Sequence, residues 1–301
     1  MKRKLLTIIF LSLTLLFAVP NREITKDHIH VYFSEKDQRI AEASLDIVLK
    51  QHELLSKKYG LDIKPLRVYI ADSEKVYKSF AGNNSAIWSV GLASDDKLLV
   101  KSPSFSRQSI ANYKKTLLHE TAHLSVSNMP LHVWFNEGYA QYYAGQNDLH
   151  KHILVARAFF GQHIIPLHQI EYLPAMNHDK AQIAYAQSVA MFSYIVDYFG
   201  EGLVGKCLQL SKEKQNFSKA FQAAFLMTPE QFEKHWKEKN RKAFRFYLFM
   251  DQNNIIWILA PIIVIIGFIL ARIRYRRKME EWEKEEEEEE IEDENYMSSR
   301  P

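Results

Sequence analysis

The chain has 301 residues, of which 47% are hydrophobic and 25% charged, so it can bury at least one sizeable core and is not disordered throughout. A formal net charge of +3 argues against a nucleic-acid-binding surface, which needs clustered lysine and arginine. The single cysteine, Cys207, excludes an internal disulfide, and its apolar neighbours favour a buried, unreactive side chain.

The first 20 residues have the organisation of an export signal. A positive head, Lys2-Arg3-Lys4, precedes an uncharged, mainly apolar stretch that ends at Val19, and Pro20 follows. That stretch is short for a membrane span, which needs about 20 residues, so a cleaved signal peptide is favoured over a signal anchor. We therefore expect residues 1–20 to direct the next part of the chain out of the cytoplasm.

The segment after the signal predicts a small mixed α/β portion. Val31 and Phe33 fit a short strand, and apolar residues then recur at helical spacing from residue 37 to residue 58, where Gly60 ends the run. Alternation predicts a further strand at residues 66–70. The remaining expected elements are a helix at residues 74–80, a turn at 82–85, and β-type segments at 87–92 and 98–100.

From Ser106 onward, apolar residues recur with a period near 3.6, which is typical of helices. Thr228, Pro229 and Glu230 form a good helix start. The expected helices cover residues 108–127, 134–144, 180–199, 201–212, 218–225 and 229–249. The predicted fold class is therefore α+β, with a small N-terminal mixed α/β portion followed by a mainly helical portion, both within one domain at residues 21–250.

The C-terminal part carries a second apolar segment. Residues 255–271 have no charge, and we expect residues 254–271 to cross a bilayer as one transmembrane helix. Basic residues follow at once, and by the positive-inside rule they mark the cytoplasmic end. The sequence thus predicts a single-pass protein of the cell membrane, with residues 21–250 outside the cytoplasm and a basic, then acidic tail at residues 272–301 inside. The glutamate-rich part of that tail is expected to be poorly ordered.

The segment His119-Glu120-Thr121-Ala122-His123 has the spacing of a zinc peptidase motif. Residues four apart lie on the same face of a helix, so His119 and His123 can bring two imidazole nitrogens to one Zn²⁺ ion. Glu120 then lies beside the metal, where a general base takes a proton from a zinc-activated water. A motif this short also occurs by chance, so the alternative is a solvent-facing helix with two histidines.

A third ligand favours the metal site, because a catalytic zinc needs three protein ligands and an open fourth position. Glu137 follows within Trp134-Phe135-Asn136-Glu137-Gly138-Tyr139-Ala140. A helix break at Asn128-Met129-Pro130 lets a second helix return antiparallel and present Glu137 to the two histidines. The sequence therefore predicts one zinc ion held by His119, His123 and Glu137.

These two motifs resemble those of the gluzincin metallopeptidases, most closely the peptidase-MA-like group, in which the first motif is followed by Trp-x-x-Glu-Gly-x-Ala. The likeness covers about residues 31–247 and includes Tyr185-Ala186-Gln187-Ser188 in a later helix. It implies that His119, His123 and Glu137 are the zinc ligands and that Glu120 is the base and later the acid. It also implies an edge strand near residues 91–92 that binds an extended peptide.

The resemblance further implies a tyrosine or histidine that stabilises the oxyanion of the reaction. Tyr185 is the candidate by position, and Tyr139, Tyr142 and Tyr143 are its competitors. The spacing between the second histidine and the glutamate is shorter than in thermolysin-like members, which leaves the mode of cleavage open. Two other histidine pairs, His28 with His30 and His150 with His152, lack an acidic or cysteine partner at ligand spacing and are expected to be surface or core residues.

The predicted function is hydrolysis of peptide bonds in peptide or protein substrates by a membrane-anchored, extracytoplasmic zinc metallopeptidase. Two alternatives stay open. One is a membrane-tethered, zinc-containing binding module without catalysis, against which the carboxylate of Glu120 argues, because a structural zinc has no use for it. The other is a hydrolase of a non-peptide amide in the cell envelope, which the motif does not exclude.

Overall fold

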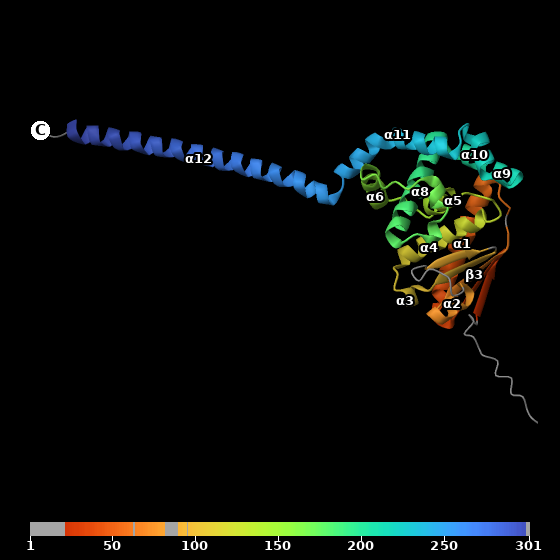
Figure 1. The fold of residues 1–301 in the computed structure, drawn as a ribbon. Coiled ribbons are helices and arrows are strands. Elements are labelled where there is room, and N and C mark those ends of the chain that lie inside the picture. The colour runs from red at the N-terminus through yellow and green to blue at the C-terminus, as the bar shows by residue number, and fades with distance from the viewer. Residues whose placement is uncertain (1–21, 63, 82–89, 95, 299–301) are drawn as a thin grey trace, which may run out of the picture. The chain divides into compact units, whose positions relative to one another are not determined.

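Figure 1 shows the chain as a computed structural model, which describes residues 22–62, 64–81, 90–94 and 96–298. The export signal expected at residues 1–20 and the turn expected at residues 82–85 lie outside the described residues. The chain divides into two compact units, Met1–Phe244 and Arg245–Pro301. In Figure 1 the strands of the first unit lie at one end of it and helices α8, α9 and α10 at the other.

A five-stranded sheet forms the N-terminal part, with the strand order β1-β2-β3-β5-β4. The two edge strands run antiparallel to their neighbours, and the three inner strands are parallel to one another. In β2, alternate side chains are buried, which is the pattern that predicted this strand. The strands are β1 (Arg22–Lys26), β2 (Ile29–Phe33), β3 (Leu66–Ala71), β4 (Gly91–Ser94) and β5 (Lys97–Lys101).

Two helices share one hydrophobic core with this sheet. α1 (Gln38–Tyr59) ends at Gly60, which adopts the left-handed backbone conformation at φ 62° that glycine tolerates best. The core also includes residues of α4 (Ile110–Ser125), so the helix with the two histidines is anchored directly to the sheet. α2 (Glu74–Ala81) supplies Val76 and Tyr77 to a second, smaller core cluster.

The remainder of the first unit is helical. Its main helices match the predicted ranges within a few residues, but α6 was not predicted, and it begins where the side chain of Asp148 caps its first turn by accepting from Lys151 N. The elements are α3 (Pro103–Ser106), α5 (Val133–Tyr143), α6 (Leu149–Phe160), α7 (Leu167–Ile170), α8 (His178–Phe199), α9 (Glu201–Lys214), α10 (Phe217–Phe225) and α11 (Pro229–Phe249), with short 3₁₀ turns at Glu35–Asp37 and Leu173–Ala175. The division between the two units falls within α11, after Phe244.

Aromatic side chains fill the core of the helical part. Trp134 of α5 is completely buried, and its ring stacks on Phe232 of α11 with the centroids 5.7 Å apart. Phe135 meets Phe192 of α8 edge to face at 5.2 Å. Such pairs stabilise a core beyond the area that they bury, so both aromatic residues before Glu137 serve to hold α5 in place.

The prediction of a transmembrane helix at residues 254–271 is wrong, and so is the fold class that included it. The apolar run lies inside α12 (Gln252–Ser298), and no helix in the described part of the chain is long and apolar enough to span a membrane. The run would give about 26 Å of helix, whereas the hydrocarbon core of a bilayer is about 30 Å thick. Of the residues that the structure describes, 72% are helical, and a small sheet lies near the N-terminus.

The acidic tail also differs from expectation, because α12 continues through it to Ser298. Glutamate, lysine and arginine are good helix formers, so a charged segment of this composition can extend a helix that has already begun.

Candidate metal centre

Two helices bring the predicted ligands together. α4 begins at the cap Ser109, whose hydroxyl accepts from Asn112 N, and it carries His119 and His123 one turn apart. α5 carries Glu137, and its first turn is fixed by Glu171, whose carboxylate oxygens both accept from Val133 N at 3.2 Å. A carboxylate at a helix N-terminus is favourable, because it meets free N–H groups and the positive end of the helix dipole.

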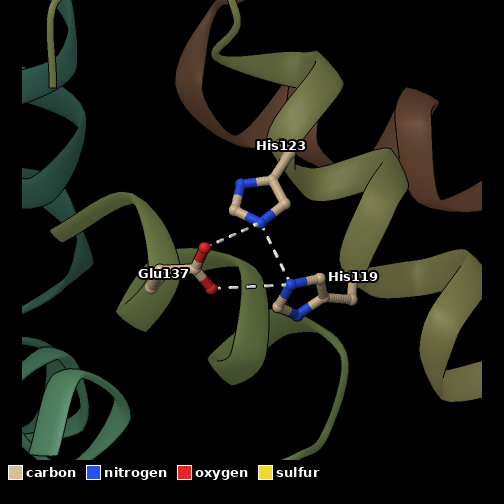
Figure 2. A group of neighbouring side chains, drawn as sticks. All are labelled: His119, His123 and Glu137. Atoms are coloured by element: carbon tan, nitrogen blue, oxygen red, sulfur yellow. Dashed lines mark hydrogen bonds and ion pairs between the residues drawn. The ribbon is translucent and has the colours of Figure 1, made fainter. Parts of the chain in front are cut away.

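Figure 2 shows the three side chains pointing toward a common centre. The Nε2 atoms of His119 and His123 lie 3.0 Å apart, and the oxygens of Glu137 lie 3.6 Å and 3.7 Å from these nitrogens. In tetrahedral coordination with zinc–ligand bonds of about 2.0–2.1 Å, ligand atoms are about 3.3 Å apart. All three donor atoms lie within 4.8 Å of one another. The spacing therefore fits a small divalent cation.

Protonation also favours a cation at this centre. Burial, followed by the charges of His123 and Lys151, holds the pKa of His119 well below its usual range, so its ring is neutral. Burial raises the pKa of Glu137, although His123 and Lys151 act in the opposite direction. Glu137 Oε2 is buried without a hydrogen-bond partner. Such a group is costly unless something else satisfies it, and a metal ion would do so.

The orientation of His123 is set by a residue that sequence reasoning missed. His123 Nδ1 lies 3.0 Å from Asn136 Oδ1, and because an amide oxygen only accepts, Nδ1–H is the donor. The lone pair of Nε2 therefore faces His119 and Glu137. Partners of this kind orient the ligands of metal sites. Asn136 directly precedes Glu137, so its place in the second motif was the available signal.

Replacing Asn136 with alanine is expected to weaken zinc binding by about 10- to 100-fold, because His123 loses the partner that fixes its tautomer and ring. Asn136→Asp keeps an acceptor in place and should retain most of the affinity. Titration against a chromogenic zinc chelator measures both variants. Equal zinc affinity in Asn136→Ala and the unmodified protein would show that this contact does not orient the ligand.

Glu120 lies beside the donor set and is 8% exposed. Burial raises its pKa to about 7, with His123 lowering it and Glu137 raising it. A bound cation would lower this pKa again, because a nearby positive charge favours the carboxylate. Gly91 of β4 makes room for this side chain, since a Cβ atom there would lie 2.6 Å from Glu120 Oε1. The edge strand therefore passes directly over the carboxylate.

The four candidate tyrosines differ in their hydrogen-bond partners and in the charges that act on them. Burial raises the pKa of Tyr185, and the charges of Glu137 and Glu120 raise it further. Tyr139 is instead hydrogen-bonded to Ser125 at 3.0 Å, and Tyr143 to Tyr59. Burial raises the pKa of Tyr142, and the charges of Asp197 and Glu201 raise it further. Of the four tyrosines, Tyr185 is the one whose pKa is raised by the charges of both Glu137 and Glu120.

A second residue missed from the sequence joins α5 to α8. Gln141 is 2% exposed, and its Nε2 donates to the carbonyl oxygens of Glu137 at 3.2 Å and Tyr185 at 3.1 Å. Both N–H donors of this buried amide are therefore used in hydrogen bonds to the backbone. The amide holds the helix of the third donor beside the helix of the tyrosine.

The other histidines and the cysteine lie elsewhere. His28 pairs with the buried His52 at 2.9 Å, and His30 pairs with Glu23 at 2.8 Å. His150 and His152 are both on α6. None of them joins the group of donors that could hold a metal in the described residues. Cys207 is buried, and burial raises the pKa of its thiol to about 12.

Comparison with known proteins identifies the family of this fold. The family model described as Peptidase MA superfamily (Peptidase_MA_2) matches residues 48–241, well over half of the chain. An uncharacterized protein of Bacillus subtilis (strain 168), YhcO, is 21% identical over 198 residues, which are 60% of this chain and 59% of the relative. The match thus spans about three fifths of the relative's length, and its name carries no function.

Proposed function

The chain belongs to the Peptidase MA superfamily, and on this premise we propose that it is a zinc-dependent peptidase with His119, His123 and Glu137 as ligands. The superfamily match confirms the coarser part of the predicted resemblance. The gluzincin subgroup and the metal are part of the proposal. The convergence of two imidazoles and one carboxylate beside a buried Glu120 carries it, because a purely structural site does not need the carboxylate of Glu120.

When bound, zinc supplies a Lewis acid that polarises the scissile carbonyl and acidifies the attacking water. Glu120 takes the proton of that water and later delivers it to the leaving amine, which requires a carboxylate within hydrogen-bond reach of the reacting atoms. Tyr185 donates a hydrogen bond to the oxyanion, which stabilises the tetrahedral transition state. Its raised pKa keeps this hydroxyl protonated and able to donate.

Strand β4 orients the substrate in this proposal. It is at the edge of the sheet, so one of its sides faces no other strand that the structure describes. An extended peptide that adds to this edge gains backbone hydrogen bonds. Because Gly91 lies against Glu120, the added peptide would run past the general base.

The direct test combines zinc content with cleavage. The full chain is freed of metal by chelation, reloaded with zinc and incubated with a randomised hexapeptide pool, and products are identified by mass spectrometry. We expect one zinc per chain and cleavage only after reloading. One zinc without cleavage of any peptide would favour a binding module or a hydrolase of non-peptide amides. No zinc binding would contradict the proposal.

Replacing Glu137 with glutamine is expected to reduce the zinc that survives dialysis to well below one per chain, because a neutral amide is a far weaker ligand than a carboxylate. The fold should persist, since the amide has nearly the same shape. Elemental analysis after dialysis measures the change, and the exposed Glu213→Gln on α9 serves as the charge-matched control. Full zinc content in Glu137→Gln would show that another residue is the third ligand.

We also propose that the domain works outside the cytoplasm, because residues 1–20 have the organisation of an export signal. Cell fractionation of the chain with and without residues 2–20 tests this. Equal cytoplasmic retention of both forms would contradict it.

A further inference from the structure

Lys151 lies beside the metal centre. It forms no salt bridge with any residue that the structure describes. Lys151 is in the first turn of α6, and its Nζ donates to Gln141 Oε1 at 2.5 Å. The charge of Lys151 lowers the pKa values of both Glu137 and His119. Only burial and the charge of His123 have larger effects on them. Burial lowers the pKa of Lys151 itself to about 8, so the ammonium is still charged at neutral pH.

The position of this ammonium is fixed relative to the reacting groups. Its acceptor, Gln141, is the same side chain that donates to the carbonyls of Glu137 and Tyr185. Lys151 is thereby connected through one buried amide to the third donor of the metal centre and to the proposed oxyanion donor. The ammonium of a flexible surface lysine would not be held at one position relative to these groups.

Among the described residues, neither neighbouring carboxylate forms a salt bridge with this ammonium. Asp148 and Glu137 are the negative groups that act on Lys151. Asp148 already caps α6, and Glu137 points into the metal centre. Lys115 adds a second positive charge. A lysine ammonium has three donors, and one is used here. A partly buried cation of this kind is costly until an anion joins it.

We propose that Lys151 binds a carboxylate of the substrate, so that the site prefers peptides with a negative group close to the scissile bond. The proposal rests on the proposed function, because it places substrate at the same centre. The carboxylate is either the C-terminus of the peptide or an acidic side chain. Both offer oxygens that accept charge-assisted hydrogen bonds from an ammonium.

The test uses the zinc-loaded full chain and one randomised hexapeptide pool in three forms: with a free C-terminal carboxylate, with a C-terminal amide, and with a C-terminal amide but no aspartate or glutamate. Binding is measured as retention of each pool on the immobilised Glu120→Gln protein, because this measurement does not depend on cleavage. Cleavage is measured on the protein that keeps Glu120. Lys151→Met removes the charge, Lys151→Arg keeps it, and Lys114→Met removes a charge from an exposed position of α4.

We expect the pools that contain carboxylates to be retained about tenfold or more better than the uncharged pool. Lys151→Met should reduce this ratio to near one, whereas Lys151→Arg and Lys114→Met should keep it. Preference for the free C-terminus alone assigns the carboxylate to the peptide end, and preference for the acidic amide pool assigns it to a side chain. Zinc content and thermal unfolding of Lys151→Met check that the centre is intact.

The absence of a preference in the unmodified site, or a preference that survives in Lys151→Met, would overturn this inference. Cleavage without any carboxylate preference would leave the proposed function standing and remove only the role of Lys151. Selective retention without cleavage would contradict the peptidase and leave the carboxylate site in place.

Discussion

Replacing Glu120 with glutamine is expected to lower the rate of peptide cleavage by about two to four orders of magnitude while zinc remains bound, because general base catalysis contributes about that much. Glutamine has nearly the same shape and fits beneath Gly91, where a Cβ atom would already be 2.6 Å from Glu120 Oε1. The change therefore removes the proton acceptor and leaves the packing. Glu120 is not one of the three converging donors, so the zinc content should not fall.

The measurement is the initial rate of cleavage of the most rapidly cut peptide, together with zinc per chain. Glu238→Gln, an exposed change on α11, is the matched control and should retain the full rate. Cleavage by Glu120→Gln at the unmodified rate would exclude Glu120 as the base. Loss of zinc from this variant would instead make Glu120 a ligand.

Replacing Gly138 with alanine is expected to lower the free energy of unfolding by about 1–3 kcal/mol and to weaken zinc binding as well. The added Cβ would lie 2.4 Å from Ser188 O and 2.7 Å from Phe192 Cβ. Neither neighbour is the end of a flexible side chain, so α5 and α8 have to separate. Glu137 is the adjacent residue, and a small movement of α5 displaces its carboxylate from the two histidines.

Gly202→Ala on α9 is the matched control, because a Cβ there meets nothing within 4 Å and alanine is the better helix former. It should leave zinc binding unchanged and leave stability equal or slightly higher. Chemical denaturation and a zinc titration on both variants give the comparison. Unchanged stability and zinc affinity in Gly138→Ala would show that the two helices have room to adjust at this contact.

Local periodicity was sufficient for most elements of the first unit. α1, β3, α8 and α11 lie within a few residues of the predicted ranges. β1 was missed because both its faces are largely exposed, so no alternation of apolar residues marks it, and pairing with β2 forms it instead.

At the C-terminus, hydropathy alone led to the wrong prediction of a transmembrane helix. The apolar run has the composition of a membrane span, but composition does not state where a helix begins and ends. α12 includes the run together with the basic and acidic residues that follow it. The prediction treated the run as an element of its own.

The sequence by itself determined the group of donors, because four residues of helix set the distance between His119 and His123 whatever the rest of the chain does. It also identified Glu137 and Glu120 through their motifs. Only the tertiary structure showed that Asn136 contacts His123, that Gln141 joins Glu137 to Tyr185, and that Lys151 is hydrogen-bonded to Gln141. Those contacts join helices that are separate in the chain, and their geometry depends on how side chains pack between them, which no local pattern encodes.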